Sequence, residues 1–228
     1  LQVSGGALDN RFGLFSAEQA LDFTLDSLDN SAKGNLVSNG TLQARVQQTL
    51  DNQADGLLSA KGALGVHAGN LDNRGGLVVG DAGVTVSGAS LNNSALGVIS
   101  SLGDLTLDIG QLDNSQGGSL DSGAALHLTA GQVSNAKGSM NAKGDLLAKA
   151  DNFSQQGGEL LAQGALNLDA GQLDNRSGGL IAANNGVTLK GSDLLNQGGE
   201  ISSRAKVDVQ AASLDNGAGK VIGDAGLN

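Results

Sequence analysis

Apolar and polar residues follow a pattern along this chain that repeats every 20 to 22 residues. The clearest copy, Leu112 to Gln132 (LDNSQGGSLDSGAALHLTAGQ), has an opening apolar-x-Asn triplet, a Gly before a second apolar stretch, and a third stretch of alternating residues. Alternation with period two predicts short β-strands with one face turned inward. The apolar residue that opens each copy is, in order, Leu8, Leu28, Leu50, Leu71, Leu91, Leu112, Val133, Phe153, Leu173, Leu194 and Leu214.

A repeat of this length predicts a solenoid, because one unit cannot bury its apolar face without neighbours stacked on it. We therefore expect an all-β parallel β-helix of about eleven coils, with three short strands per coil separated by corners. Residues 1–228 form one repeat array without an internal domain boundary. Since the chain opens and closes partway through a copy, we also expect it to be a segment of a longer array.

Glycine marks two corners of the unit. A residue that is always Gly indicates a backbone with positive φ, or an approach so close that a Cβ would obstruct it. The other corner is less strict, because Gln19 and Ala205 replace its Gly in two copies. The invariant corner glycines are Gly13, Gly34, Gly56, Gly76, Gly97, Gly118, Gly138, Gly158, Gly179, Gly199 and Gly219.

The Asn of the opening triplet is expected to share the inward face with the apolar residue two positions before it. Coils stack ~4.8 Å apart, a distance at which identical amides can form a continuous hydrogen-bonded ladder. Such a ladder would satisfy an otherwise costly buried polar group, so a structural role is favoured over ligand binding. The predicted ladder consists of Asn10, Asn30, Asn52, Asn73, Asn93, Asn114, Asn135, Asn175, Asn196 and Asn216, with Gln155 as the one exception.

An outward residue lies between the apolar residue and the Asn, and it is frequently Asp. A column of carboxylates could attract Ca²⁺, but Asp at a corner also bonds to nearby backbone. We favour a solvated acidic edge without a metal, since the Gly-Gly-x-Gly-x-Asp repeat of calcium β-rolls is absent. The acidic positions are Asp9, Asp29, Asp51, Asp72, Asp113, Asp174 and Asp215.

Composition narrows the function classes. Thirteen Lys and Arg against 23 Asp and Glu give a formal net charge of −10, which argues against nucleic acid or an anionic membrane as partner. No apolar run approaches the ~20 residues of a membrane span, so membrane insertion is not expected. The absence of Cys excludes disulfides and thiolate metal sites, and no cofactor is predicted. The absence of Pro fits a chain whose backbone pairs on both sides.

Leucine-rich repeats share this period and also carry a recurring Asn, but they separate Leu from Asn by three residues rather than two. The units LDNRGGLVVGDAGVTVSGAS, LDNSQGGSLDSGAALHLTAGQ and LDNRSGGLIAANNGVTLKGSD instead resemble the repeats of filamentous haemagglutinin-type exoproteins, a group that includes effectors of contact-dependent growth inhibition. The resemblance covers essentially the whole chain. It implies a right-handed parallel β-helix that forms the shaft of a secreted or cell-surface protein of a Gram-negative bacterium.

In that family an outer-membrane pore exports the protein, and other regions contact a target-cell receptor or carry toxic activity. A structural shaft is therefore the favoured function, and a receptor- or glycan-binding surface on the shaft is the alternative. A polysaccharide-degrading enzyme is disfavoured because the chain has no Trp, no Tyr and four Phe. Phe15, Phe23 and Phe153 fit inward positions, and Phe12 joins the first two in the most divergent copy. His67 and His127 lie three copies apart, ~14 Å along the axis, too far for shared chemistry.

Overall fold

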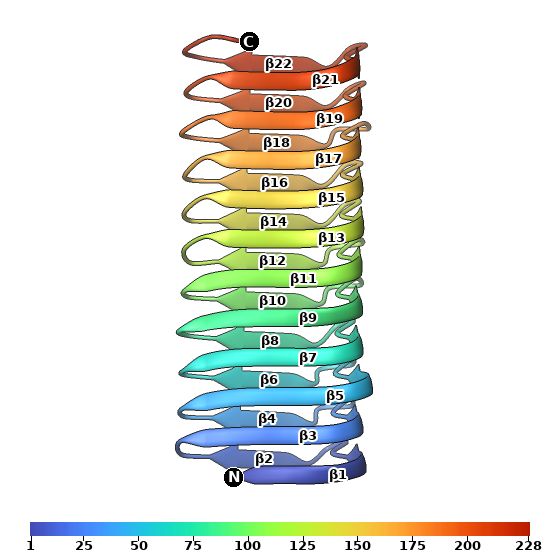
Figure 1. Cartoon of the computed structure of the whole chain (residues 1–228), viewed down its shortest axis with the longest axis vertical. Coiled ribbons are helices and arrows are strands. Elements are labelled where there is room, and N and C mark those ends of the chain that lie inside the picture. Colours follow the sequence, from blue (N-terminus) through green and yellow to red (C-terminus); the bar gives the residue numbers. More distant parts are fainter.

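The computed structural model describes all residues 1–228 and contains 22 β-strands in two parallel sheets of eleven strands each. The chain alternates between the sheets, so the odd-numbered strands stack in one and the even-numbered strands in the other (Figure 1). The strands climb in sequence order from one end of an elongated body to the other (Figure 1). No helix in this structure is long and apolar enough to span a membrane.

The sheet of long strands, here called sheet 1, contains β1 (Gln2–Asp9), β3 (Ala20–Asp29), β5 (Thr41–Asp51), β7 (Ala63–Asp72), β9 (Gly83–Asn92), β11 (Asp104–Asp113), β13 (Leu126–Ser134), β15 (Leu146–Ser154), β17 (Leu166–Asp174), β19 (Val187–Leu195) and β21 (Val207–Asp215).

The sheet of short strands, sheet 2, contains β2 (Leu14–Ala17), β4 (Asn35–Ser38), β6 (Leu57–Ala60), β8 (Leu77–Gly80), β10 (Val98–Ser101), β12 (Ser119–Ser122), β14 (Ser139–Ala142), β16 (Glu159–Ala162), β18 (Leu180–Ala183), β20 (Glu200–Ser203) and β22 (Lys220–Gly223).

Equivalent residues of successive copies pair with each other. Leu112 pairs with Leu91 in the preceding coil and with Val133 in the following one, and the other opening residues align in the same way. The register shifts in only two strand pairs, β3 with β5 and β5 with β7, because β5 is longer than both of its neighbours. The prediction of a parallel β-solenoid of about eleven turns is therefore confirmed.

The expected three strands per coil are wrong, because the structure has two. The third stretch of one copy and the opening triplet of the next form one continuous strand, as in β11 from Asp104 to Asp113. Ile109 and Leu112 are both buried while the two residues between them are exposed, so the inward face shifts by one position there. Neighbouring strands make the same shift together, and pairing continues in register from Ile109 to Leu112. The interruption of the apolar–polar alternation in the sequence therefore marks a bend within one strand and not a corner between two strands.

A single apolar core of 47 buried residues fills the space between the sheets. Sheet 1 contributes residues such as Leu105 and Leu107, and sheet 2 contributes the second residue of each short strand, such as Ile99 and Leu120. Burying one such side chain stabilises the fold by about 1.5–3 kcal/mol. Because every coil contributes similar side chains, no single coil carries the core.

The first coils show how the aromatic residues fit this core. Phe23 and Phe153 are fully buried, and Phe15 packs edge-on against Phe23 with ring centroids 5.5 Å apart. The expectation that Phe15, Phe23 and Phe153 point inward is confirmed. Phe12 lies at a corner, exposed over 79% of its surface.

Candidate functional site

The most regular polar feature of the molecule lies at the corner that leads from each long strand to the next short strand. There the side chain of Asn93 lies inside the corner and is completely buried. Its Nδ2 donates to Oδ1 of Asn114 in the next coil at 2.7 Å, to the carbonyl of Gly97 at 3.1 Å and to that of Ser119 at 3.0 Å. One amide thus joins two coils and both sides of one corner.

The amide contacts repeat along the shaft. The bonds from Asn10 through Asn30, Asn52, Asn73, Asn93 and Asn114 to Asn135 are each 2.7 Å long. Asn135 donates to Oε1 of Gln155 at 2.8 Å. Asn175 donates to Asn196 at 2.7 Å, and Asn196 to Asn216 at 2.6 Å. The structure thus holds two continuous rows of amides, separated between Gln155 and Asn175.

The longer side chain of Gln155 interrupts the ladder. Its Nε2 reaches only the carbonyl of Leu180, at 3.4 Å, and does not bond to Asn175. As a result Oδ1 of Asn175 is buried without a hydrogen-bond partner. A buried acceptor without a partner costs about 1–3 kcal/mol, so the junction between these two coils is weaker than the others.

The invariant corner glycines are explained by close approach. A Cβ on Gly118 would lie 2.4 Å from the carbonyl oxygen of Asn93, and 2.7 Å from both the carbonyl oxygen and Oδ1 of Asn114. None of the eleven has a positive φ, so the alternative explanation by backbone conformation is wrong. The ladder amide and this glycine require each other, because the amide oxygen occupies the space of the missing side chain.

Positive φ falls instead on the residues just before each invariant glycine. Two residues separate Asn135 from Gly138, and one of them, Lys137, has a positive φ of 59°. Where three residues intervene, the last two are left-handed, as at Ala95 (50°) and Leu96 (69°). The number of intervening residues therefore sets the corner's conformation. Several of these positions hold residues with a Cβ, for which this conformation costs about 1–2 kcal/mol.

The outward Asp residues act as local caps of the same corner. Oδ1 of Asp113 accepts a hydrogen bond from the backbone N–H of Ser115 at 3.0 Å. Asp9, Asp29, Asp51, Asp72, Asp174 and Asp215 accept the equivalent bond from the residue two positions later. The predicted backbone role of these carboxylates is confirmed.

Arginine neutralises three of these carboxylates. Arg11, Arg74 and Arg176 each bond the Asp two residues before, at 2.6 to 2.7 Å. The bonds from the Arg11 side chain and backbone lower the pKa of Asp9 to about 2. Bonds from Arg176 likewise lower the pKa of Asp174. A carboxyl group that ionises this readily is a poor proton donor near neutral pH, so Asp9 and Asp174 are suited to hold a corner as carboxylates.

The acidic column forms no cation cage. Asp9, Asp29, Asp51 and Asp72 do align in consecutive coils. No group of three or more His, Asp or Glu side chains, however, is arranged to hold a metal ion. His67 and His127 lie on β7 and β13, and Nδ1 of His67 is 2.9 Å from Oγ of Ser87.

A groove of about 870 Å³ follows the ends of the long strands over coils around β9 to β19. We call it the amide groove. One wall is a column of side chains that precede the opening apolar residue, namely Gln111, Gln132, Asn152 and Gln172, and the other contains Asn92, Asp113, Ser134, Ser154 and Asp174. Sequence reasoning missed the first wall, although the residue before each opening Leu is polar in almost every copy.

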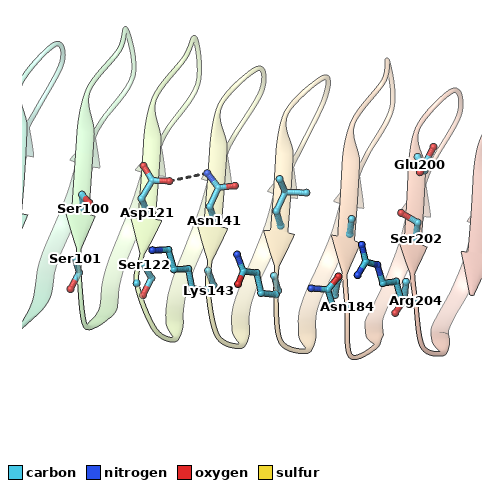
Figure 2. Close-up of a pocket in the computed structure, with 18 of the residues that line it drawn as sticks. Ser100, Ser101, Asp121, Ser122, Asn141, Lys143, Asn184, Glu200, Ser202 and Arg204 are labelled. Atoms are coloured by element: carbon cyan, nitrogen blue, oxygen red, sulfur yellow. Dashed lines mark hydrogen bonds between the residues drawn. The ribbon is translucent and has the colours of Figure 1, made fainter.

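A second groove, of about 800 Å³, lies along sheet 2 from β10 to β22. Figure 2 shows its two rows of side chains, one on the short strands and one at the corners that follow them. Nδ2 of Asn141 bonds Oδ1 of Asp121 at 2.8 Å, while Lys143 and Arg204 project from corners three coils apart (Figure 2). The charged groups are spread along the axis and do not converge on one point.

These features define a structural β-solenoid, whose buried amides bond to neighbouring coils and whose outer grooves are lined mainly by polar residues. The chain belongs to the haemagglutinin repeat family, whose model matches residues 1–45, 39–108, 103–170 and 161–228 and thus spans the whole chain. No curated protein and no solved structure gave a significant match. The resemblance to filamentous haemagglutinin-type repeats is therefore confirmed. Such repeats belong to secreted or cell-surface exoproteins, where they form a structural shaft and not an enzyme.

Proposed function

We propose that this chain is a shaft segment of a large exoprotein of a Gram-negative bacterium, and that it holds an adhesive or growth-inhibiting activity away from the cell. The in-register stack of eleven coils carries this proposal, because equivalent residues support one another from β1 to β22. At ~4.8 Å per coil, the segment adds ~50 Å of reach. Its partners are an outer-membrane secretion pore and, through other regions of the parent protein, a target-cell receptor.

The parent exoprotein provides the test. Deleting one, two or three coils within this segment should leave export and the distal activity intact, and should shorten the surface filament in proportion. A duplicated coil should lengthen it. Filament length measured by electron microscopy, together with an adhesion or growth-inhibition assay, checks both statements. Loss of export or activity after deletion of a single folded coil would contradict a shaft role.

The amide groove supports a second function, binding of a receptor or glycan along the shaft. Its amides, carboxylates and hydroxyls extend over several coils and can exchange hydrogen bonds with a polar polymer. Replacing Gln132 and Asn152 with Ala tests this function, with Thr85→Ala on β9 as a control outside the groove. Selective loss of cell or glycan binding in the groove variant would favour this second function over a passive shaft.

A further inference from the structure

The outer face of sheet 2 lacks charged residues at one end of the shaft and carries them farther along. In the short strands the second and fourth residues are the more buried, so the first and third face outward. Over the first five coils these outward positions contain no charged residue. We call this surface the uncharged face, and it consists of Leu14, Ser16, Asn35, Val37, Leu57, Ser59, Leu77, Val79, Val98 and Ser100.

Charge returns farther along the same face. The equivalent outward positions from β12 to β22 include Asp121, Glu159, Glu200 and Lys220, of which Figure 2 shows Asp121 and Glu200. The outer face of sheet 1 in the first coils also carries charge, at Asp22 and Arg45 for example. With a net charge of −10, two copies of the chain repel each other over most orientations. The uncharged face is a surface through which they can meet without opposing charges.

We propose that two copies of this chain associate side by side through the uncharged face, parallel and related by a two-fold axis along the shaft. In the short strands, the first residues form one outward column and the third residues form another. A two-fold axis in this direction places the first-residue column of one copy over the third-residue column of the other, at the same height. Leu57 of each copy then lies over Ser59 of the other. Leu14 with Ser16, and Val98 with Ser100, repeat this pairing of large with small.

Two further features favour a second copy as the occupant. Both surfaces have the same coil spacing of ~4.8 Å, so the two copies stay aligned from coil to coil along the contact. In the parallel arrangement the charged half of sheet 2 also avoids like charges in opposition, because Glu159 meets Leu161 and Glu200 meets Ser202. An antiparallel arrangement that overlaps along the full length would instead place the uncharged face of one copy over the charged half of the other.

The size of this surface predicts a weak, reversible dimer. Four residues of strand by five coils give a footprint of about 300 Å² per copy, and all eleven coils give about 700 Å². Stable complexes bury about 800 Å² per partner, and transient ones bury less. Concentration-dependent dimerisation is therefore expected, strengthened by salt, which screens the repulsion between the acidic copies.

Sedimentation equilibrium of the purified chain over a concentration series tests the proposal. Leu77→Lys places a charge against the apolar Val79 of the other copy, twice in each dimer, and should weaken dimerisation about tenfold or more. Thr85→Lys adds the same charge to an exposed position on the other sheet and should leave dimerisation unchanged. A mixture of Leu77→Lys and Leu77→Glu variants should recover association. Thermal melting of each variant verifies that it is folded.

The orientation has its own test, since the chain contains no Cys. A short bifunctional cross-linker should join a Leu57→Cys copy to a Ser59→Cys copy, and should not join Leu57→Cys to Leu180→Cys, the position that a full-length antiparallel arrangement would bring over Leu57. A wild-type chain that stays monomeric at all concentrations and salt levels would overturn the proposal. So would equal weakening by Leu77→Lys and Thr85→Lys, or preferential cross-linking of Leu57→Cys to Leu180→Cys.

Discussion

Inward and outward residues of one triplet should differ sharply in their effect on stability. Leu112 is 3% exposed, and Leu112→Asp would leave an unpaired charge in the core, at a cost of several kcal/mol. Asp113→Ala removes only the hydrogen bond to the N–H of Ser115 and should cost about 1 kcal/mol. Urea unfolding of both variants measures the two effects. Equal losses of stability would contradict the assignment of Leu112 to the inward face and Asp113 to the outward face.

The interrupted ladder predicts a stabilising substitution. Gln155→Asn gives the corner the side chain used in the other coils and provides a donor for Oδ1 of Asn175, which now has no partner. We expect a gain of about 1 kcal/mol in the free energy of unfolding. Asn135→Gln is the matched control, because it introduces the longer side chain one coil earlier. It should lower the free energy of unfolding by a similar amount. A loss of stability in Gln155→Asn together with a gain in Asn135→Gln would contradict a stabilising contribution of the ladder.

Acid should remove the contribution of the Asp174–Arg176 pair. The pKa of Asp174 is lowered in the folded chain, so its contribution is complete above the unfolded value of about 3.9 and is lost as pH falls through the folded value. The stability advantage of the wild type over Asp174→Asn should be below about 1 kcal/mol at pH 7. Urea unfolding at pH 7 and pH 3 should show that this advantage shrinks in acid. An advantage that grows in acid would exclude a lowered pKa.

At the scale of the corner, two glycines should resist substitution for different reasons. Gly118→Ala forces a Cβ against backbone oxygens, the nearest 2.4 Å away, and should disrupt the corner at a cost of several kcal/mol. Gly178 has open space around its Cβ position but a φ of +83°, so Gly178→Ala should cost only about 1–2 kcal/mol. Melting temperatures of the two variants measure the difference. The reverse order would refute close approach as the reason for the invariant glycine.

The sequence predicted those elements that depend on side-chain pattern. The coil length, the inward column through Leu112 and the two corners marked by glycine follow from repetition alone. The bend between Ile109 and Leu112 was missed, because a break in alternation does not show whether backbone pairing also stops. The left-handed residues were missed for another reason. Positions such as Lys137 and Leu96 carry ordinary side chains, and their strain is offset by the bonds of the corner around them.

The candidate site was predictable only in part. The Asn column follows from its spacing to the inward residue, and Gln155 is visible in the sequence as an exception. Whether the longer amide continues or interrupts the row depends on where the extra methylene of Gln155 places its Nε2, and this became clear only from the structure. The amide groove and the uncharged face are sets of outward residues, and their alignment became clear once the register between coils was known.

At the scale of the whole molecule, the stability of a shaft should be a sum of coil and nearest-neighbour contributions. Deleting Leu112 to Gln132 tests this claim most directly, because it joins Gln111 to Val133 and brings Asn93 beneath Asn135. The product should fold, keep its β-rich circular dichroism spectrum, and be shorter by ~4.8 Å out of ~50 Å in small-angle scattering. An unfolded or collapsed product would contradict the modular solenoid on which the proposed function rests.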